Sequence, residues 1–170
     1  MASFGHVAVG IAAARAYDGE FRWKTMVALS AFPLLPYLDV IAFKFGVPYS
    51  APFGHRGATH SVMFAVLAAV STWAVTRKPK DVLTMFLVVL SHPLLDSLTD
   101  GGLGVALWWP FSNERVFATW TPIPVAPIGK GMLSARGAYV MVVEAAVSLP
   151  LILIAHFATR ARQFFADLSP

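Results

Sequence analysis

The sequence lacks cysteine and contains few charged residues. Without cysteine the chain can form neither a disulfide nor a thiolate metal site. Charged residues make up 13% of the 170 residues and hydrophobic residues 57%, whereas a soluble domain carries about 25% charged residues. So few charges cannot cover the surface of a soluble domain, and we expect an integral membrane protein with a single domain over residues 1–170.

Five apolar segments predict the fold. They cover residues 3–17, 26–47, 60–76, 82–99 and 137–159. A complete membrane span needs about 20 residues, and several of these segments are short or contain proline and polar residues, which is tolerated where a helix lines a wet cavity. We therefore predict an all-α, polytopic membrane helix bundle with about five transmembrane or partly inserted helices. The connection 100–136, rich in Gly, Pro and Trp, predicts an interfacial loop with short helical turns.

Basic residues are distributed between the apolar segments. A net charge of +4 is compatible with nucleic-acid binding, but the charges form no single patch, so we expect no nucleic-acid partner. Residues 15–24, 77–80 and 160–162 hold most of them, and five spans place these regions on one side. The positive-inside rule makes that side cytoplasmic. The other side holds Lys44, Arg56, Arg115, Lys130 and Arg136.

Histidine and aspartate residues from four segments fall at one level, on the side away from most basic residues. These residues are His6, Asp39, His55, His60, His92 and Asp96. An ionisable group within a span costs about 2.5–3.5 kcal/mol and usually marks function. We therefore expect a functional site on the outer face of the membrane.

Two local motifs carry the chemistry. His92 and Asp96 are four residues apart, so a helix places them on one face, where imidazole and carboxylate can bind zinc; the alternative is an ordinary helix-surface pair. In the run 54–61, Arg56 is suited to a two-pronged grip on phosphate or carboxylate, or is a snorkelling interfacial arginine. Thr59 orients ligands or substrate of this site by a hydrogen bond, or caps the following helix.

Together these residues resemble the LexA-binding, inner-membrane-associated hydrolases, also called membrane-bound metal-dependent hydrolases. The resemblance covers about residues 4–112. It rests on His6, on Leu35-Pro36-Tyr37-Leu38-Asp39, on His55-Arg56-Gly57-Ala58-Thr59-His60-Ser61, and on His92-Pro93-Leu94-Leu95-Asp96-Ser97-Leu98-Thr99 with Gly101 and Trp109-Pro110-Phe111. It implies a prokaryotic inner (plasma) membrane protein with hydrolase activity.

One position departs from that family. The family usually has Pro-Asp-x-Asp where this chain has Tyr37 in the first acidic position and Asp39 in the second. Loss of a carboxylate would reduce the number of metal ions or weaken the site. More distantly, the ligand order is similar to that of zinc-dependent phospholipases C, which implies a multi-metal centre that cleaves phosphoesters.

The predicted mechanism is hydrolysis of a lipid or other amphiphilic phosphoester by metal-activated water, with one or two divalent ions, zinc being preferred. The predicted metal ligands are His6, Asp39, His60, His92 and Asp96. Arg56 and His55 are the predicted catalytic residues, Arg56 as charge neutraliser and His55 either as general acid or as a residue that supports the metal ligands. The predicted substrate-binding or ligand-orienting residues are Thr59, Ser61, Thr99, Trp109 and Glu144. For Glu144 the alternative is an interhelical hydrogen bond.

Three other functions remain open. A metal-free lipid phosphatase also uses an HxxxD pair, but it needs Lys/Arg-Pro and Pro-Ser-Gly-His motifs that this sequence lacks. A transporter would use the His/Asp cluster as a path for cations. Transporter sites usually lie near the midplane of the membrane, between two repeated halves. Here the cluster is expected near one face, and the sequence shows no repeat. A non-catalytic regulatory membrane protein would hold a structural metal with no open coordination position.

Overall fold

The computed structural model describes residues 3–20 and 22–168, and this part of the chain is helical, without a named strand. The α-helices are α1 (Ser3–Asp18), α2 (Trp23–Ala31), α3 (Val62–Thr76), α4 (Pro79–Ser97) and α5 (Ala135–Asp167). Three 3-10 helices join them, namely η1 (Phe32–Phe45), η2 (Ala58–His60) and η3 (Gly129–Leu133). The predicted helical bundle is confirmed.

The second predicted segment is not one uniform helix. It consists of α2 and then the 3-10 helix η1, which contains Pro33 and Pro36. Proline has no backbone N–H and disturbs the regular α-helical ladder, and a 3-10 turn is a common alternative where that ladder is interrupted. Gly46, with a φ of 74°, ends the segment and donates its N–H to Phe43.

Two further boundaries differ from the predicted segments. The last helix, predicted over 137–159, continues to Asp167. The helix predicted from residue 60 begins at Val62, because the Ser61 hydroxyl caps it by accepting a hydrogen bond from the N–H of Phe64 at 3.1 Å. The interpretation of Thr59 as the cap is therefore wrong.

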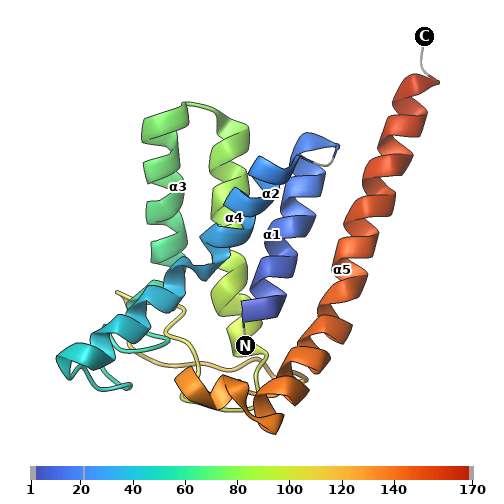
Figure 1. Ribbon diagram of the computed structural model, residues 1–170. Helices are drawn as coiled ribbons and strands as arrows, with labels where there is room; N and C mark the ends of the chain where they lie inside the picture. Colours follow the sequence, from blue (N-terminus) through green and yellow to red (C-terminus); the bar gives the residue numbers. More distant parts are fainter. Residues whose placement is uncertain (1–2, 21, 169–170) are drawn as a thin grey trace.

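Helix α1 lies at the centre of the bundle, in contact with α2, α4 and α5, while α3 packs on α4 (Figure 1). The close approach of α1 to α2 depends on Gly10, where a Cβ atom would lie 2.3 Å from the Cα of Ser30. Small residues allow this kind of backbone contact between helices in membranes.

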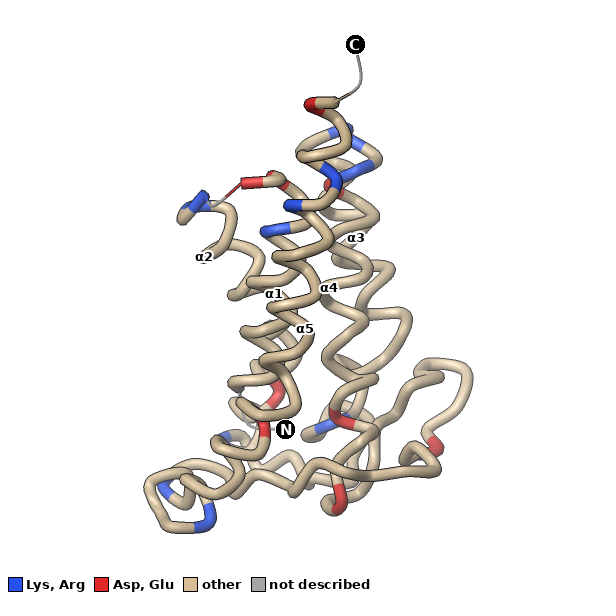
Figure 2. Tube along the Cα trace, turned by 90° about the vertical axis from the view of Figure 1, so that its right-hand side faces the viewer, with Lys and Arg blue, Asp and Glu red and all other residues tan. Residues whose placement is uncertain are grey.

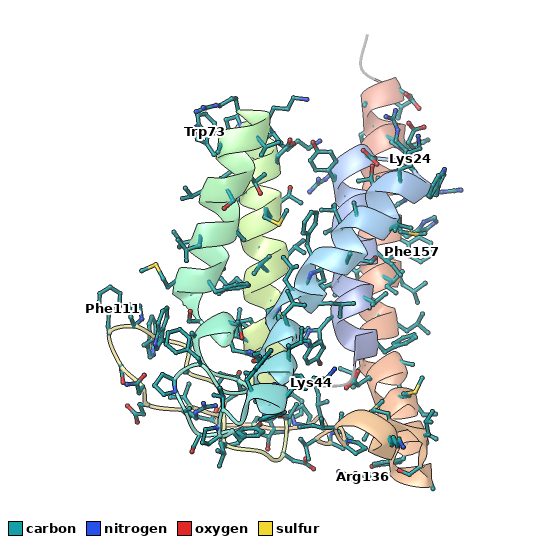
Figure 3. The ribbon with its side chains drawn as sticks, turned by 60° about the vertical axis from the view of Figure 1, so that its left-hand side comes forward. Lys24, Lys44, Trp73, Phe111, Arg136 and Phe157 are labelled. Atoms are coloured by element: carbon teal, nitrogen blue, oxygen red, sulfur yellow. The ribbon has the colours of Figure 1, made fainter. Side chains whose placement is uncertain are left out.

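The bundle has two different ends. Figure 1 shows the α1–α2 and α3–α4 connections together with the C-terminal part of α5 at one end, and the 46–61 and 98–134 segments at the other. The three basic regions therefore share one end, as predicted, and Figure 2 shows much of the blue of Lys and Arg at this end, with some red beside it and further blue at the other end. Lys24 and Trp73 lie towards this end in Figure 3, and Phe111 and Arg136 towards the opposite one.

The two longest apolar stretches are poorly buried. These stretches, Trp23–Phe45 and Ala135–Asp167, are long and apolar enough to cross a membrane, yet only 22% and 17% of their most apolar windows are buried. A core helix of a soluble protein would be mostly buried. The fully buried side chains of the protein include histidine, aspartate and glutamate beside valine and isoleucine.

Segment 98–134 forms the base of the bundle (Figure 1). It contains η3 and two isolated bridges, Thr99 with Ile123 and Val105 with Val116. A short helical turn in an otherwise irregular connection was expected there and is found. This base matters for function because it closes the bundle at the end where the predicted site residues lie.

Candidate metal centre

The predicted metal ligands come together in the interior of the bundle. His6 lies in the first turns of α1, Asp39 in η1, His60 in η2, and His92 and Asp96 in α4. All five are buried, and four of them have an exposed fraction of 0%. The prediction that residues from four segments meet at one level is confirmed by this geometry.

The first group consists of His6, His92 and Asp96, whose potential ligand atoms lie within 4.8 Å of one another. The rings of His6 and His92 stack with centroids 3.8 Å apart. The Asp96 carboxylate lies 3.5 Å from His6 Nε2 and 3.8 Å from His92 Nε2. His60 approaches the same carboxylate through Nε2, at 3.3 Å. Three imidazoles and one carboxylate therefore surround one point.

His92 is oriented by a backbone carbonyl. Its Nδ1 lies 2.5 Å from the carbonyl oxygen of Pro33, which can only accept, so Nδ1 carries the proton and Nε2 presents a lone pair. That carbonyl is available for a sequence reason. In a 3-10 helix it would accept the N–H of the residue three positions later, and that residue is Pro36, which has none.

His60 is oriented in the same way by a carboxylate. Its Nδ1 lies 3.1 Å from Asp39 Oδ2, and its Nε2 faces His92 Nε2 at 2.9 Å. If both rings are neutral and donate from Nδ1, two lone pairs point at each other. Such an arrangement is repulsive unless a cation, either a proton or a metal ion, lies between the nitrogens.

The ring nitrogens of His6 also lack a hydrogen-bond partner among the residues that the structure describes. Both nitrogens are buried. A buried polar atom left without a partner costs about 1–3 kcal/mol. Coordination of a metal ion by the ring would remove this cost.

The second group consists of Asp39, His55 and His60. Asp39 Oδ1 lies 2.7 Å from His55 Nδ1, and Oδ2 accepts from the backbone N–H of Arg56 at 3.0 Å and from the Thr59 hydroxyl at 2.9 Å. With His60 Nδ1, four groups that can donate converge on one carboxylate. This fills most of the roughly four lone-pair positions of a carboxylate.

These contacts hold Arg56 in an uncommon conformation. Its φ is 61°, in the left-handed region that costs a non-glycine residue about 1 kcal/mol or more. Strain of this kind persists where surrounding contacts fix the backbone, and it is concentrated at functional sites. The side chain is 3% exposed, with Nε 3.3 Å from Asp96 Oδ2 and Nη1 donating to the Gly101 carbonyl at 2.9 Å.

A cavity of about 440 Å³ adjoins the centre. Its polar lining residues are Tyr37, Tyr49, His55 and Arg56. Its apolar lining residues include Val40, Val125, Pro127, Ile128 and Met132. Gly102 also lines it, and a Cβ there would lie 3.0 Å from Tyr49 Oη and 3.1 Å from Arg56 Nη1. The cavity therefore combines cationic and hydrogen-bonding groups with apolar ones.

The pKa values of His60 and Tyr49 are shifted, by burial in both cases and for His60 also by the carboxylates of Asp39 and Asp96. Burial alone would lower the pKa of His60, but hydrogen bonds and charge interactions with Asp39 and Asp96 outweigh it and raise the pKa. Burial raises the pKa of the Tyr49 hydroxyl, which therefore stays protonated at neutral pH and can donate.

Tyr37, in the position where the resembling family has aspartate, borders the centre with its ring. The ring contacts His92 edge-on at a centroid distance of 4.6 Å and His6 at 5.5 Å. It thus occupies space beside the first group and supplies no carboxylate. The acidic member of the first group is Asp96.

The remaining predicted site residues have different positions. Thr99 is buried and donates to the Asp96 carbonyl at 2.8 Å, at the end of α4. Glu144, on α5, accepts from the backbone N–H of Gly5 at 3.2 Å, so it makes the interhelical contact given as its alternative. Trp109 packs edge-on against Phe53 and is not among the described residues that line the cavity.

Sequence reasoning missed two positioning groups. One is the Pro33 carbonyl, for which Pro36 was the available signal. The other is Arg115, which donates to the carbonyls of His55 at 2.8 Å and of Tyr49 and Ala51, both at 3.0 Å. It fixes the loop that carries His55 and Arg56, and no local pattern around Arg115 predicts a contact so distant in sequence.

Comparison with known proteins gives the family. The family described as YdjM inner membrane protein matches residues 1–163. Inner membrane protein YbcI of Escherichia coli (strain K12) is 46% identical over 100 residues, which are 55% of this chain and 58% of YbcI. The match therefore spans somewhat more than half of that relative. No solved structure matches. Since the family match covers nearly the whole sequence, the chain belongs to the YdjM inner membrane protein family.

Proposed function

We propose that this inner membrane protein is a metal-dependent hydrolase that cleaves a phosphoester of an amphiphilic substrate. The observation that carries the proposal is the pair of Nε2 atoms of His60 and His92, 2.9 Å apart, each ring donating from Nδ1 to its own acceptor. Asp96 and His6, whose ring nitrogens make no hydrogen bond within the described residues but whose Nε2 lies 3.5 Å from Asp96, complete the donor set around them. This set of imidazoles and one carboxylate fits zinc.

We assign one ion to this centre and a positioning role to Asp39. Metal-bound histidines usually donate their other N–H to a carboxylate or carbonyl, which fixes the tautomer, and Asp39 and the Pro33 carbonyl do this for His60 and His92. A second ion on His60 Nδ1 would displace that contact. The imidazole ring would also hold the two ions farther apart than the about 3.5–4 Å of usual two-metal sites, because each Zn–N bond alone is about 2 Å.

When bound, zinc would supply a nucleophile at neutral pH by lowering the pKa of water to about 7. The chain's own residues do the rest. Arg56 borders the cavity beside Asp96 and neutralises negative charge on the phosphoester. His55 is held by Asp39 through Nδ1, and its ring lines the cavity, so it is placed to donate a proton to the leaving oxygen.

The substrate class follows from the walls of the cavity. Its polar lining includes the Arg56 guanidinium and Tyr49, which suit an anionic headgroup. Its apolar lining, with Val125, Ile128 and others, suits the first part of a lipid chain. A phospholipid or polyprenyl phosphate has this combination, and we propose that it approaches from the outer face.

The test measures metal and hydrolysis together. Detergent-purified wild type and the His92→Ala and Asp81→Asn variants are compared for bound metal by mass spectrometry and for hydrolysis of phospholipid and polyprenyl phosphate panels. We expect about one equivalent of zinc in wild type and in Asp81→Asn, whose carboxylate contacts Tyr17 far from the centre, and none in His92→Ala. Absence of metal in wild type after incubation with zinc and manganese would overturn the proposal and leave a shared proton between the histidines.

One observation favours a second function, a non-catalytic structural zinc site. Four protein donors, from His6, His60, His92 and Asp96, surround the point, and structural sites typically use four protein ligands. Cobalt substitution distinguishes the two. Azide added to the cobalt protein changes the visible spectrum when a coordination position is open, as the hydrolase requires, and leaves it unchanged at a closed structural site.

A further inference from the structure

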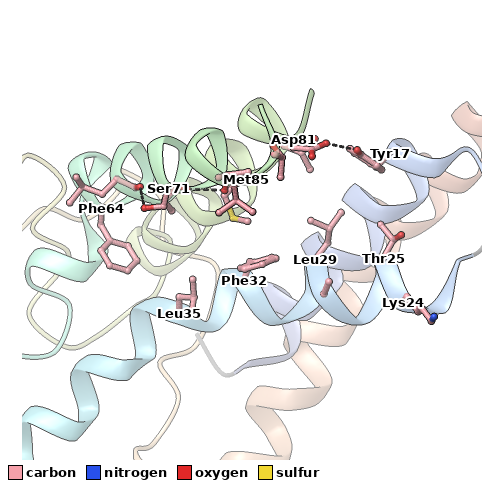
Figure 4. A pocket seen from close by; sticks show the side chains of 17 residues that line it. Tyr17, Lys24, Thr25, Leu29, Phe32, Leu35, Phe64, Ser71, Asp81 and Met85 are labelled. Carbon is pink, nitrogen blue, oxygen red and sulfur yellow. Dashed lines mark hydrogen bonds between the residues drawn. The ribbon is translucent and has the colours of Figure 1, made fainter. Parts of the chain in front are cut away.

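A second, larger groove lies between α2 with η1 and the α3–α4 pair. Its volume is about 810 Å³. Figure 4 shows its walls, with Leu29, Phe32 and Leu35 on one side and Phe64 and Met85 on the other. None of the residues that line it belongs to the candidate metal centre, so it is a separate feature of the fold.

The groove has the depth of one leaflet. On α3 its lining runs from Phe64 to Thr76, and on the opposite wall from Lys24 to Leu35. At 1.5 Å per residue, a helical stretch such as Phe64–Thr76 is about 18 Å long, close to half of the about 30 Å of a bilayer's hydrocarbon core. A groove of this length, with apolar walls, accommodates one extended acyl chain.

Two hydroxyl groups on the α3 wall of the groove already donate within their own helix. Ser71 donates to the Leu67 carbonyl at 2.8 Å and Thr72 to the Ala68 carbonyl at 2.9 Å, both within α3. An apolar chain can therefore lie against them without leaving an unsatisfied donor. A polar or peptidic occupant would find almost no partners along this wall.

One end of the groove is basic. Lys24 lines it, and its ammonium group lies over the Trp23 ring at 5.9 Å from the centroid, without a hydrogen bond or ion pair within residues 3–20 and 22–168. Asp81, at the same end, accepts from the Tyr17 hydroxyl at 2.5 Å, and Lys80 donates to the Tyr17 carbonyl at 2.6 Å. The basic connections of the bundle meet at this end (Figure 2), so a headgroup there faces net positive charge.

From the groove's length, its apolar walls and the lysine at its end, we infer that it binds one acyl chain of an anionic phospholipid, with the lipid phosphate on Lys24. The occupant comes from the leaflet at the basic end, opposite the candidate metal centre. The site is a stable lipid contact of the fold and does not depend on the hydrolase proposal.

Native mass spectrometry of the full chain, with phosphatidylglycerol or phosphatidylcholine added to the detergent, tests the inference. Wild type is expected to retain one phosphatidylglycerol in preference to phosphatidylcholine. Lys24→Gln is expected to reduce that preference about fivefold, the factor that one lysine contributes near a membrane surface. Lys44→Gln, at the other end of the bundle, is the matched control and keeps the preference.

A second pair of variants tests the groove itself. Ala68→Trp fills it and is expected to abolish retention of both lipids, whereas Leu87→Trp, an exposed position on α4 outside the groove, retains them. Equal retention by Ala68→Trp and wild type, or equal affinity of wild type for the two lipids, overturns the inference. A wild-type dimer that is lost in Ala68→Trp also overturns it, because a second copy would then cover the groove. If Ala68→Trp does not fold, the Lys24→Gln comparison decides alone.

Discussion

Replacement of Asp39 by asparagine tests whether this residue positions a ligand or is itself a ligand. The Asp39 carboxylate accepts from the Arg56 N–H and the Thr59 hydroxyl and contacts Nδ1 of His55 and His60. Asparagine keeps the shape but turns one acceptor into an NH₂ group that faces donors. His60 then loses the contact that keeps its proton on Nδ1 and its Nε2 lone pair towards the metal.

The expected loss of zinc affinity in Asp39→Asn follows from the role of Asp39 in orienting His60. Loss of the group that orients a metal-bound histidine typically costs 10–100-fold in metal affinity, which is about 1.4–2.8 kcal/mol at 1.4 kcal/mol per factor of ten. We therefore expect zinc to bind Asp39→Asn 10–100-fold more weakly, with an unchanged stoichiometry of about one ion at saturation. Loss of a direct ligand, as in His92→Ala, abolishes the stoichiometric site.

Competition with a chelator of known affinity, on detergent-purified protein, measures both quantities. Asp81→Asn is the control, since its carboxylate contacts Tyr17 at the other end of the bundle. If saturation of Asp39→Asn falls by a full ion relative to wild type, Asp39 is a ligand and the positioning role is refuted. An unchanged affinity would refute any role of Asp39 in the centre.

Three further substitutions test single contacts. Pro36→Ala restores an N–H that competes for the Pro33 carbonyl, so we expect a several-fold weaker metal affinity from looser orientation of His92, and an unchanged affinity would contradict that role. Gly102→Ala places a methyl group against Arg56 at a φ of 90°, and we expect a loss of about 1–2 kcal/mol in stability by thermal unfolding together with reduced hydrolysis. Ser61→Ala removes the cap of α3 and is expected to cost about 1 kcal/mol without changing the metal stoichiometry; a loss of metal would show that Ser61 acts in the centre.

Much of the fold was predictable from local composition. Long apolar stretches with few charges predict membrane helices, and the helices α1, α3, α4 and α5 lie where the apolar segments do. Segment 26–47 was less predictable, because the prolines favour an interrupted helix without specifying its form. The extension of α5 to Asp167 depends on a polar stretch whose helicity hydropathy does not report.

For the candidate site, the identity of the residues was predictable from the sequence, but their contacts were not. The sequence singled out six His and Asp residues, because ionisable groups in apolar segments are costly and have few reasons to occur. The family resemblance then indicated the expected ligands, His6, Asp39, His60, His92 and Asp96. Which nitrogen faces which acceptor depends on contacts between distant segments. Only the tertiary structure shows that the Pro33 carbonyl accepts from His92, that Asp39 contacts His60, and that Arg115 donates to the His55 carbonyl. These contacts join segments that are distant in the sequence. They form only when the helices pack, so the local sequence does not indicate them.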